Sequence, residues 1–362
     1  MASRVRKPIL IALGVIAVVV AAWSITRAGG PAVPECAGGQ SLEFNCFAER
    51  YAAMTRASGP DAALKDLAAR RAASGYLVSA CHQLTHVIGR TAGELHGEAA
   101  FAQGSDVCSS GYYHGIVESV MTALGPARIV EQAHVVCATH RRQDSRSYLL
   151  YNCVHGMGHG FMAVFGTDVF RSLAGCDGLA DSWERHHCYG GVFMENLTAI
   201  TNPVRPSTSL RPDAPLYPCT AVHARYKAEC YVKQTAYALH VSRDDFAATF
   251  RICRRDADAE FRAACYQGLG ADASIKSSKH VIGDAARAAT TGALCLQGPD
   301  GEARAHCIAG AVTTSVRDRG GDDGPARRLC AALADRELAA ACEAARLVAS
   351  HGVPTPEAAH TH

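Results

Sequence analysis

The chain has 362 residues, of which 48% are hydrophobic and 19% are charged, and its formal net charge is +2. This length suits either two ordinary domains or one elongated repeat array. The hydrophobic content excludes a wholly disordered chain, and the near-neutral charge gives no basis for a polyanion-binding surface, so nucleic acid is not an expected partner.

The first 45 residues predict export. Residues 1–8 form a basic stub, and residues 9–26 form an uncharged apolar segment that is near the lower length limit for a membrane span. This segment is interpreted as a signal anchor that holds the protein in the membrane, or else as a cleaved signal peptide. Residues 27–45 then form a linker. The remainder faces the periplasm or the cell exterior, membrane-anchored in the first case and secreted in the second.

The sixteen cysteines follow one another in close pairs, four of which have the same separation of twelve positions. The chain contains no Cys-x-x-Cys sequence, the spacing typical of zinc knuckles and redox dithiols. We therefore predict eight structural disulfides formed in an oxidising compartment. The expected pairs are Cys36 with Cys46, Cys81 with Cys108, Cys137 with Cys153, Cys176 with Cys188, Cys219 with Cys230, Cys253 with Cys265, Cys295 with Cys307, and Cys330 with Cys342.

The segments around these pairs repeat at intervals of about 35 to 45 residues. Each unit has the pattern of a polar amphipathic helix, a charged turn and a second, apolar helix. The predicted fold class is all-α: a disulfide-stapled array of helical hairpins, like an α-solenoid, behind the N-terminal membrane anchor. A glycine stands three positions after the second cysteine in five units, which we interpret as a point of close helix packing. These glycines are Gly111, Gly156, Gly191, Gly268 and Gly310.

The array divides into two halves of different composition. A proline- and serine-rich loop at residues 201–218 separates a histidine-rich half, residues 46–200, from a histidine-poor half, residues 219–349. Residues 350–362 are expected to form a disordered tail.

Candidate metal ligands recur at helical spacing in the first half. Three pairs stand four positions apart, so each pair shares one face of a helix. The pairs are His82 with His86, His114 with Glu118, and His155 with His159. His114 and His159 both follow a cysteine by six positions, and Met194 has that position in the next unit, beside Glu195. We predict that the five histidines and Met194 bind a metal ion, and that Glu118 and Glu195 are ligands or the catalytic acid and base.

The donor types suit zinc, iron, manganese or copper, and we expect a transition-metal ion that is copper, iron or zinc. A thioether ligand would favour copper, whereas carboxylate ligands would favour zinc or iron, and both alternatives stay open. Arg90 follows His86 by one helical turn, and we expect it to form an ion pair with a carboxylate of the cluster.

The other histidines lack this repeat register, and most of them are predicted to be surface or turn residues. They are His96, His134, His140, His186, His187, His223, His240, His280 and His306. His351, His360 and His362 lie in or near the tail, where they can bind metal adventitiously.

Three functions fit this pattern. The first is an extracytoplasmic metal-dependent enzyme, with an oxidoreductase acting on a secreted peptide or small molecule preferred, because a histidine-rich core suits oxygen-active metals. The second is a non-enzymatic scaffold whose solenoid face binds a peptide or an envelope protein, with the histidines serving only in packing. The third is a metal storage or delivery protein.

Overall fold

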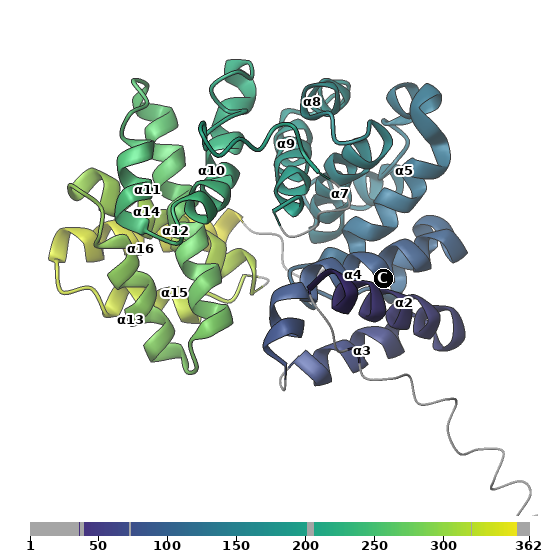
Figure 1. Ribbon diagram of the computed structural model, residues 1–362, viewed down its shortest axis with the longest axis horizontal. Helices are drawn as coiled ribbons and strands as arrows, with labels where there is room; N and C mark the ends of the chain where they lie inside the picture. Colours follow the sequence, from purple (N-terminus) through teal and green to yellow (C-terminus); the bar gives the residue numbers. More distant parts are fainter. Residues whose placement is uncertain (1–35, 37–39, 72–73, 201–205, 320, 353–362) are drawn as a thin grey trace, which may run out of the picture. The chain divides into compact units, whose positions relative to one another are not determined.

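The computed structural model describes residues 36, 40–71, 74–200, 206–319 and 321–352. All regular secondary structure in these ranges is helical, which confirms the all-α prediction (Figure 1). Within the same ranges, no helix has both the length and the apolar character needed to cross a membrane. The expected signal anchor at residues 9–26 lies outside the described residues, as does the tail beyond residue 352.

The chain separates into a short unit that ends at Cys46 and a large unit from Phe47 onward. The short unit contains the Cys36–Cys46 disulfide and the first residues of α2 (Gln40–Ser58). The large unit contains every other helix and all of the candidate metal ligands, and the description that follows concerns this unit.

Long helices of the large unit form a row in which each packs against the next one along the chain (Figure 1). They are α4 (Gly75–His96), α5 (Gly111–Gln132), α7 (Tyr148–Val164), α9 (Ser182–Thr198), α10 (Ala224–Val241), α12 (Ala259–His280), α14 (Gly301–Arg317) and α16 (Arg336–Gly352). Shorter helices pack against their neighbours in this row. They are α3 (Pro60–Arg71), the 3-10 helix η1 (Gly97–Gln103), α6 (Ala138–Gln143), α8 (Val169–Asp177), α11 (Phe246–Cys253), α13 (Asp284–Cys295) and α15 (Gly324–Ala331).

The helical hairpins are built as the repeat predicts, a short helix, a turn and a long helix. The charged turns have a local role, because aspartates in them accept hydrogen bonds from backbone N–H groups in the first turn of the following helix. Asp181 caps α9 in this way, Asp258 caps α12 and Asp300 caps α14. Each such cap stabilises its helix by about 1 kcal/mol.

All eight expected disulfides are present. In four hairpins the bond joins the end of the short helix to the long helix, as predicted. These bonds are Cys176–Cys188, Cys253–Cys265, Cys295–Cys307 and Cys330–Cys342. The first half departs from this scheme, because Cys81 lies within α4 and Cys108 lies just before α5, so their disulfide joins two successive long helices.

The five repeat glycines lie where neighbouring long helices come close together. A Cβ atom at Gly191 on α9 would overlap the carbonyl oxygen of His155 on α7. A Cβ at Gly310 on α14 would likewise overlap the carbonyl oxygen of Gln267 on α12. Close helix packing at these positions is therefore confirmed, and it brings side chains of successive helices within reach of one another.

Candidate metal centre and the adjoining cavity

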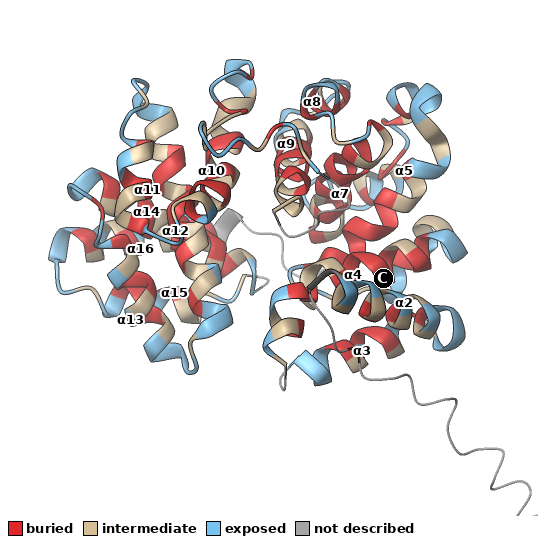
Figure 2. Cartoon of the chain, viewed as in Figure 1, coloured by how far each residue is buried: buried red, intermediate tan, exposed pale blue. Residues whose placement is uncertain are grey.

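The candidate histidines lie on three successive long helices, α4, α5 and α7. The last of these is enclosed by protein, since every residue from Asn152 to Met162 is buried (Figure 2). An amphipathic helix has one exposed face, so burial on all sides marks α7 as the centre of this half of the array.

The five histidine rings lie together, and we call them the histidine cluster. Centroids of the His82 and His86 rings are 4.8 Å apart, and those of His114 and His155 are also 4.8 Å apart. The rings of His86 and His159 connect these two pairs, at 4.9 Å. His114 has a middle position, 5.3 Å from His86 and 5.0 Å from His159.

The ring nitrogens form two triads that share His114. In each triad, one nitrogen per ring lies within 4.8 Å of the other two; the members are His82, His86 and His114, and His114, His155 and His159. The Nε2 atoms of His82 and His86 are 3.2 Å apart. Two nitrogens bound to one tetrahedral ion would be about 3.4 Å apart, because metal–nitrogen bonds are about 2.0 to 2.1 Å long. The structure therefore brings these histidines, which the sequence analysis predicts as ligands, into two groups that could hold a metal ion.

Hydrogen bonds at the outer nitrogens orient two of the rings. Nδ1 of His82 lies 2.8 Å from the carbonyl oxygen of Cys108, to which it donates. Nδ1 of His159 donates to the Glu195 carboxylate, also at 2.8 Å. Donation from Nδ1 assigns the proton to that atom and leaves a lone pair on Nε2, which is the arrangement typical of metal-ligating histidines.

Other nitrogens of the cluster are buried and have no hydrogen-bond partner among the described residues. They are both ring nitrogens of His114, Nε2 of His155 and Nε2 of His159. Leaving a buried polar atom unpaired costs about 1–3 kcal/mol, and a cation bound to these nitrogens would offset that cost. Burial lowers the pKa of His82 to about 4 and holds the pKa of His114 and of His155 well below the ordinary value, so these rings are neutral, the form that binds metals.

Glu118 lies at the edge of the cluster and is 2% exposed. It accepts a hydrogen bond from Arg90 at 2.9 Å, which confirms the ion pair expected for that arginine. A carboxylate oxygen of Glu118 also lies 3.7 Å from Nδ1 of His86. Glu118 therefore contacts the outer side of a candidate ligand, and its role as ligand or acid–base group stays a prediction.

The two candidates on α9 differ in where they point. Glu195 is buried and binds His159, whereas Met194 is half-buried. Successive side chains on a helix project about 100° apart, so Met194 points away from the direction that Glu195 takes toward the cluster. The role of Met194 as a ligand, and of Glu195 as a catalytic group, stay predictions.

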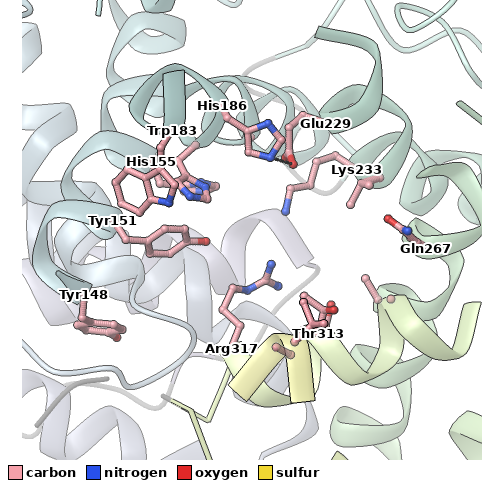
Figure 3. A pocket seen from close by; sticks show the side chains of 18 residues that line it. Tyr148, Tyr151, His155, Trp183, His186, Glu229, Lys233, Gln267, Thr313 and Arg317 are labelled. Atoms are coloured by element: carbon pink, nitrogen blue, oxygen red, sulfur yellow. Dashed lines mark ion pairs between the residues drawn. The ribbon is translucent and has the colours of Figure 1, made fainter. Parts of the chain in front are cut away.

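A cavity of about 380 Å³ adjoins the cluster, lined by residues of α7, α9, α10, α12, α14 and α16 (Figure 3). One wall is aromatic and contains Tyr148, Tyr151 and Trp183. Lys233 on α10 and Arg317 on α14 line the side that faces these rings. The volume is within the range of small-molecule sites.

His155 belongs to both the cluster and the cavity lining. Its Nε2 is buried and unpartnered among the described residues. Its Nδ1 borders Gly190, a lining residue whose other close neighbour is the Glu229 carboxylate. One imidazole thus separates the candidate metal centre from the cavity.

Three histidines outside the repeat register have positions that the sequence did not indicate, although the side chain of His186 is 50% exposed, as expected for a surface residue. His186 and His187 line the cavity, and His140 on α6 is buried against Phe101, with ring centroids 4.5 Å apart. Register relative to the cysteines was too narrow a criterion, because side chains at other helix positions also face inward. Burial lowers the pKa of His187 to about 3.

His186 forms an ion pair with Glu229, its Nε2 lying 2.7 Å from a carboxylate oxygen. The hydrogen bond that His186 donates to this carboxylate raises the pKa of His186. Burial alone would raise the pKa of Glu229, but the hydrogen bond from His186 and the nearby charges of His186 and Lys233 together outweigh burial and lower that pKa to about 2. Glu229 and Lys233 stand four positions apart on α10, a spacing that could have directed attention to them; Arg317 carries no comparable sequence signal.

Comparison with protein-family models, curated proteins and solved structures finds no match for this chain. Function is therefore argued from the side chains of the cluster and the cavity, since a solenoid-like array of helices does not by itself assign one.

Proposed function

We propose that this chain is an extracytoplasmic metal-dependent enzyme whose histidine cluster holds a transition-metal ion. The observation that carries the proposal is the convergence of five imidazoles in two triads, with four buried ring nitrogens that have no hydrogen-bond partner among the described residues. Eight disulfides suggest an oxidising compartment outside the cytoplasm. Attachment to the membrane through residues 9–26 is part of the proposal.

The adjoining cavity supports an enzyme over a storage or delivery protein. Storage and delivery need a metal that exchanges readily, whereas His114 and His159 are 3% and 0% exposed. An enzyme needs a ligand site beside the metal, and His155 borders one. The cavity volume favours a small molecule, or one side chain of a secreted peptide, as substrate.

The donor set supports a redox reaction. Imidazole ligands suit copper, iron or zinc, and of these copper and iron are redox-active. Glu195 binds Nδ1 of His159, and Glu118 lies beside Nδ1 of His86, so both orient candidate ligands. The two triads share His114, both of whose nitrogens lack a partner among the described residues, so the cluster has donors for up to two ions.

The test is metal content. The full-length chain, with the tail histidines His351, His360 and His362 replaced by alanine, is purified after export and its metals are measured by elemental analysis. We expect near-stoichiometric copper, iron or zinc, and at least a tenfold loss in a His114→Ala, His159→Ala variant. A matched His96→Ala, His240→Ala variant removes two exposed histidines and should keep its metal.

A second variant tests the metal centre in case the His114→Ala, His159→Ala variant does not fold. Glu195→Gln keeps the shape of the side chain and leaves all five imidazoles in place, but it removes the carboxylate that orients His159; such substitutions weaken metal binding about 10- to 100-fold. If the parent binds none of the three metals even after reconstitution, or if the His114→Ala, His159→Ala variant keeps them, the metal centre does not exist and the scaffold alternative replaces it.

A further inference from the structure

The cavity lining includes two cationic side chains, Lys233 and Arg317. No carboxylate lies within ion-pair distance of Lys233 among the described residues. Glu229 stands one turn earlier on the same helix, but its carboxylate is engaged by His186 at 2.7 Å. The carboxylate that meets Arg317 belongs to its chain neighbour Asp318, at 3.3 Å.

These two charges face one another. Figure 3 shows the Lys233 amino group and the Arg317 guanidinium directed into the same space, with the Tyr151 hydroxyl pointing toward it. Burial lowers the pKa of Lys233, and the nearby Arg317 lowers it further. An anion between the two cations would relieve both effects, because its negative charge offsets the cost of burying the positive charges.

The opposite wall suits a planar ring. The rings of Trp183 and His187 meet at 4.3 Å between centroids, and those of Tyr151 and His187 at 4.8 Å, so three rings form one continuous surface. Aromatic surfaces of this kind favour stacked or edge-to-face contact with another ring.

We infer that the cavity binds a small aromatic carboxylate, with its acid group between Lys233 and Arg317 and its ring against Tyr151 and Trp183. Guanidinium and hydroxyl groups donate hydrogen bonds to carboxylate oxygens, and the ammonium group adds a point charge. Such a ligand lies beside His155. Its identity as the substrate of the metal centre rests on the function proposed above, whereas its binding requires no metal.

Benzoate is the probe, and Trp183 reports its binding. The full-length chain has two tryptophans, so Trp23→Phe leaves Trp183 as the sole source of tryptophan fluorescence. Chelator-treated protein is titrated with benzoate, with acetate, which lacks the ring, and with benzyl alcohol, which lacks the charge. We expect a saturable response to benzoate, with binding of both other compounds at least tenfold weaker.

Charge variants test the assignment. Lys233→Gln and Arg317→Gln should each weaken benzoate binding about 10- to 100-fold, the range for losing a hydrogen bond to a charged group. Lys276→Gln is the control, because Lys276 pairs with Asp244 and does not line the cavity. Lys233→Arg and Arg317→Lys keep the charge and should bind benzoate within a few-fold of the parent, which separates loss of charge from loss of folding.

The outcomes are distinguishable from those of the metal test. Benzoate binding that persists in the His114→Ala, His159→Ala variant supports the cavity assignment whether or not the parent holds metal. The inference is overturned if no saturable response occurs, if benzyl alcohol or acetate binds as tightly as benzoate, or if removing both cations leaves the affinity unchanged.

Discussion

Replacing Gly191 with alanine tests whether backbone contact between helices holds α7 and α9 together. The added Cβ would overlap the carbonyl oxygen of His155. A backbone carbonyl cannot rotate away as a side chain can, so the two helices must separate. Because His155 and His159 lie on α7 and Glu195 lies on α9, the separation also reaches the cluster.

The expected magnitude is the difference of two opposing effects. Overpacking a well-packed interior costs about 1–3 kcal/mol, and a backbone contact places Gly191→Ala at the upper end. Alanine gains about 1 kcal/mol over glycine inside a helix. The free energy of unfolding should therefore fall by about 2 kcal/mol.

Gly292→Ala on α13 is the matched control. Its Cβ would meet methyl groups of Leu329 and Leu333 at 3.7 Å, an ordinary van der Waals contact. No separation of helices is needed, so the helix preference remains and stability should rise by about 0.5–1 kcal/mol.

The assay is urea unfolding of both oxidised variants, followed by far-UV circular dichroism. Two chemically identical substitutions should shift the midpoint in opposite directions. If Gly191→Ala is as stable as the parent, or shifts in the same direction as Gly292→Ala, then the helices are not in close backbone contact and the packing argument is wrong.

Two further predictions concern protonation. Chelator-treated protein should lose stability as the pH falls from about 6.5 to 5. Burial lowers the pKa of His82 to about 4 and of His187 to about 3, so the unfolded chain takes up these protons first, at a cost of up to about 1.4 kcal/mol per pH unit for each histidine. Urea midpoints that do not change between about pH 6.5 and 5 would contradict this prediction. In Glu229→Gln, the pKa of His186 should fall, because the hydrogen bond that His186 donates to the Glu229 carboxylate is the largest cause of its raised pKa. NMR titration of the ring measures this pKa, and an unchanged value refutes the ion pair.

The fold was largely predictable because its constraints are local. Each disulfide closes a short segment of chain, so regular spacing such as that of Cys253 and Cys265 is visible in the sequence. Helical hairpins follow from periodicity within about 30 residues. The departure at Cys81 and Cys108 was not visible, since nothing in their spacing shows that η1 replaces a hairpin helix between them.

The histidine cluster was predictable in part, for a related reason. Side chains four positions apart share a helix face, and equivalent positions of a repeat array lie on one face, so His114 and His159 were expected on neighbouring helices. The convergence of all five rings depends on how closely the helices pack, which the sequence does not show. The cavity could not be predicted in this way. Its lining comes from six helices between Tyr148 and Ala349, and their convergence depends on the packing angles summed over the array, which no single repeat reveals.

The pairing of each cysteine with the next one along the chain has a consequence for biogenesis. A polypeptide exported from its N-terminus delivers its thiols to the oxidising side in sequence order, and the native partner of each waiting thiol is the next to arrive. Bonds can thus close one after another during translocation, before distant cysteines emerge to compete. Assembly in this order reduces the need for disulfide reshuffling and leaves few thiols open to cross-linking with other chains.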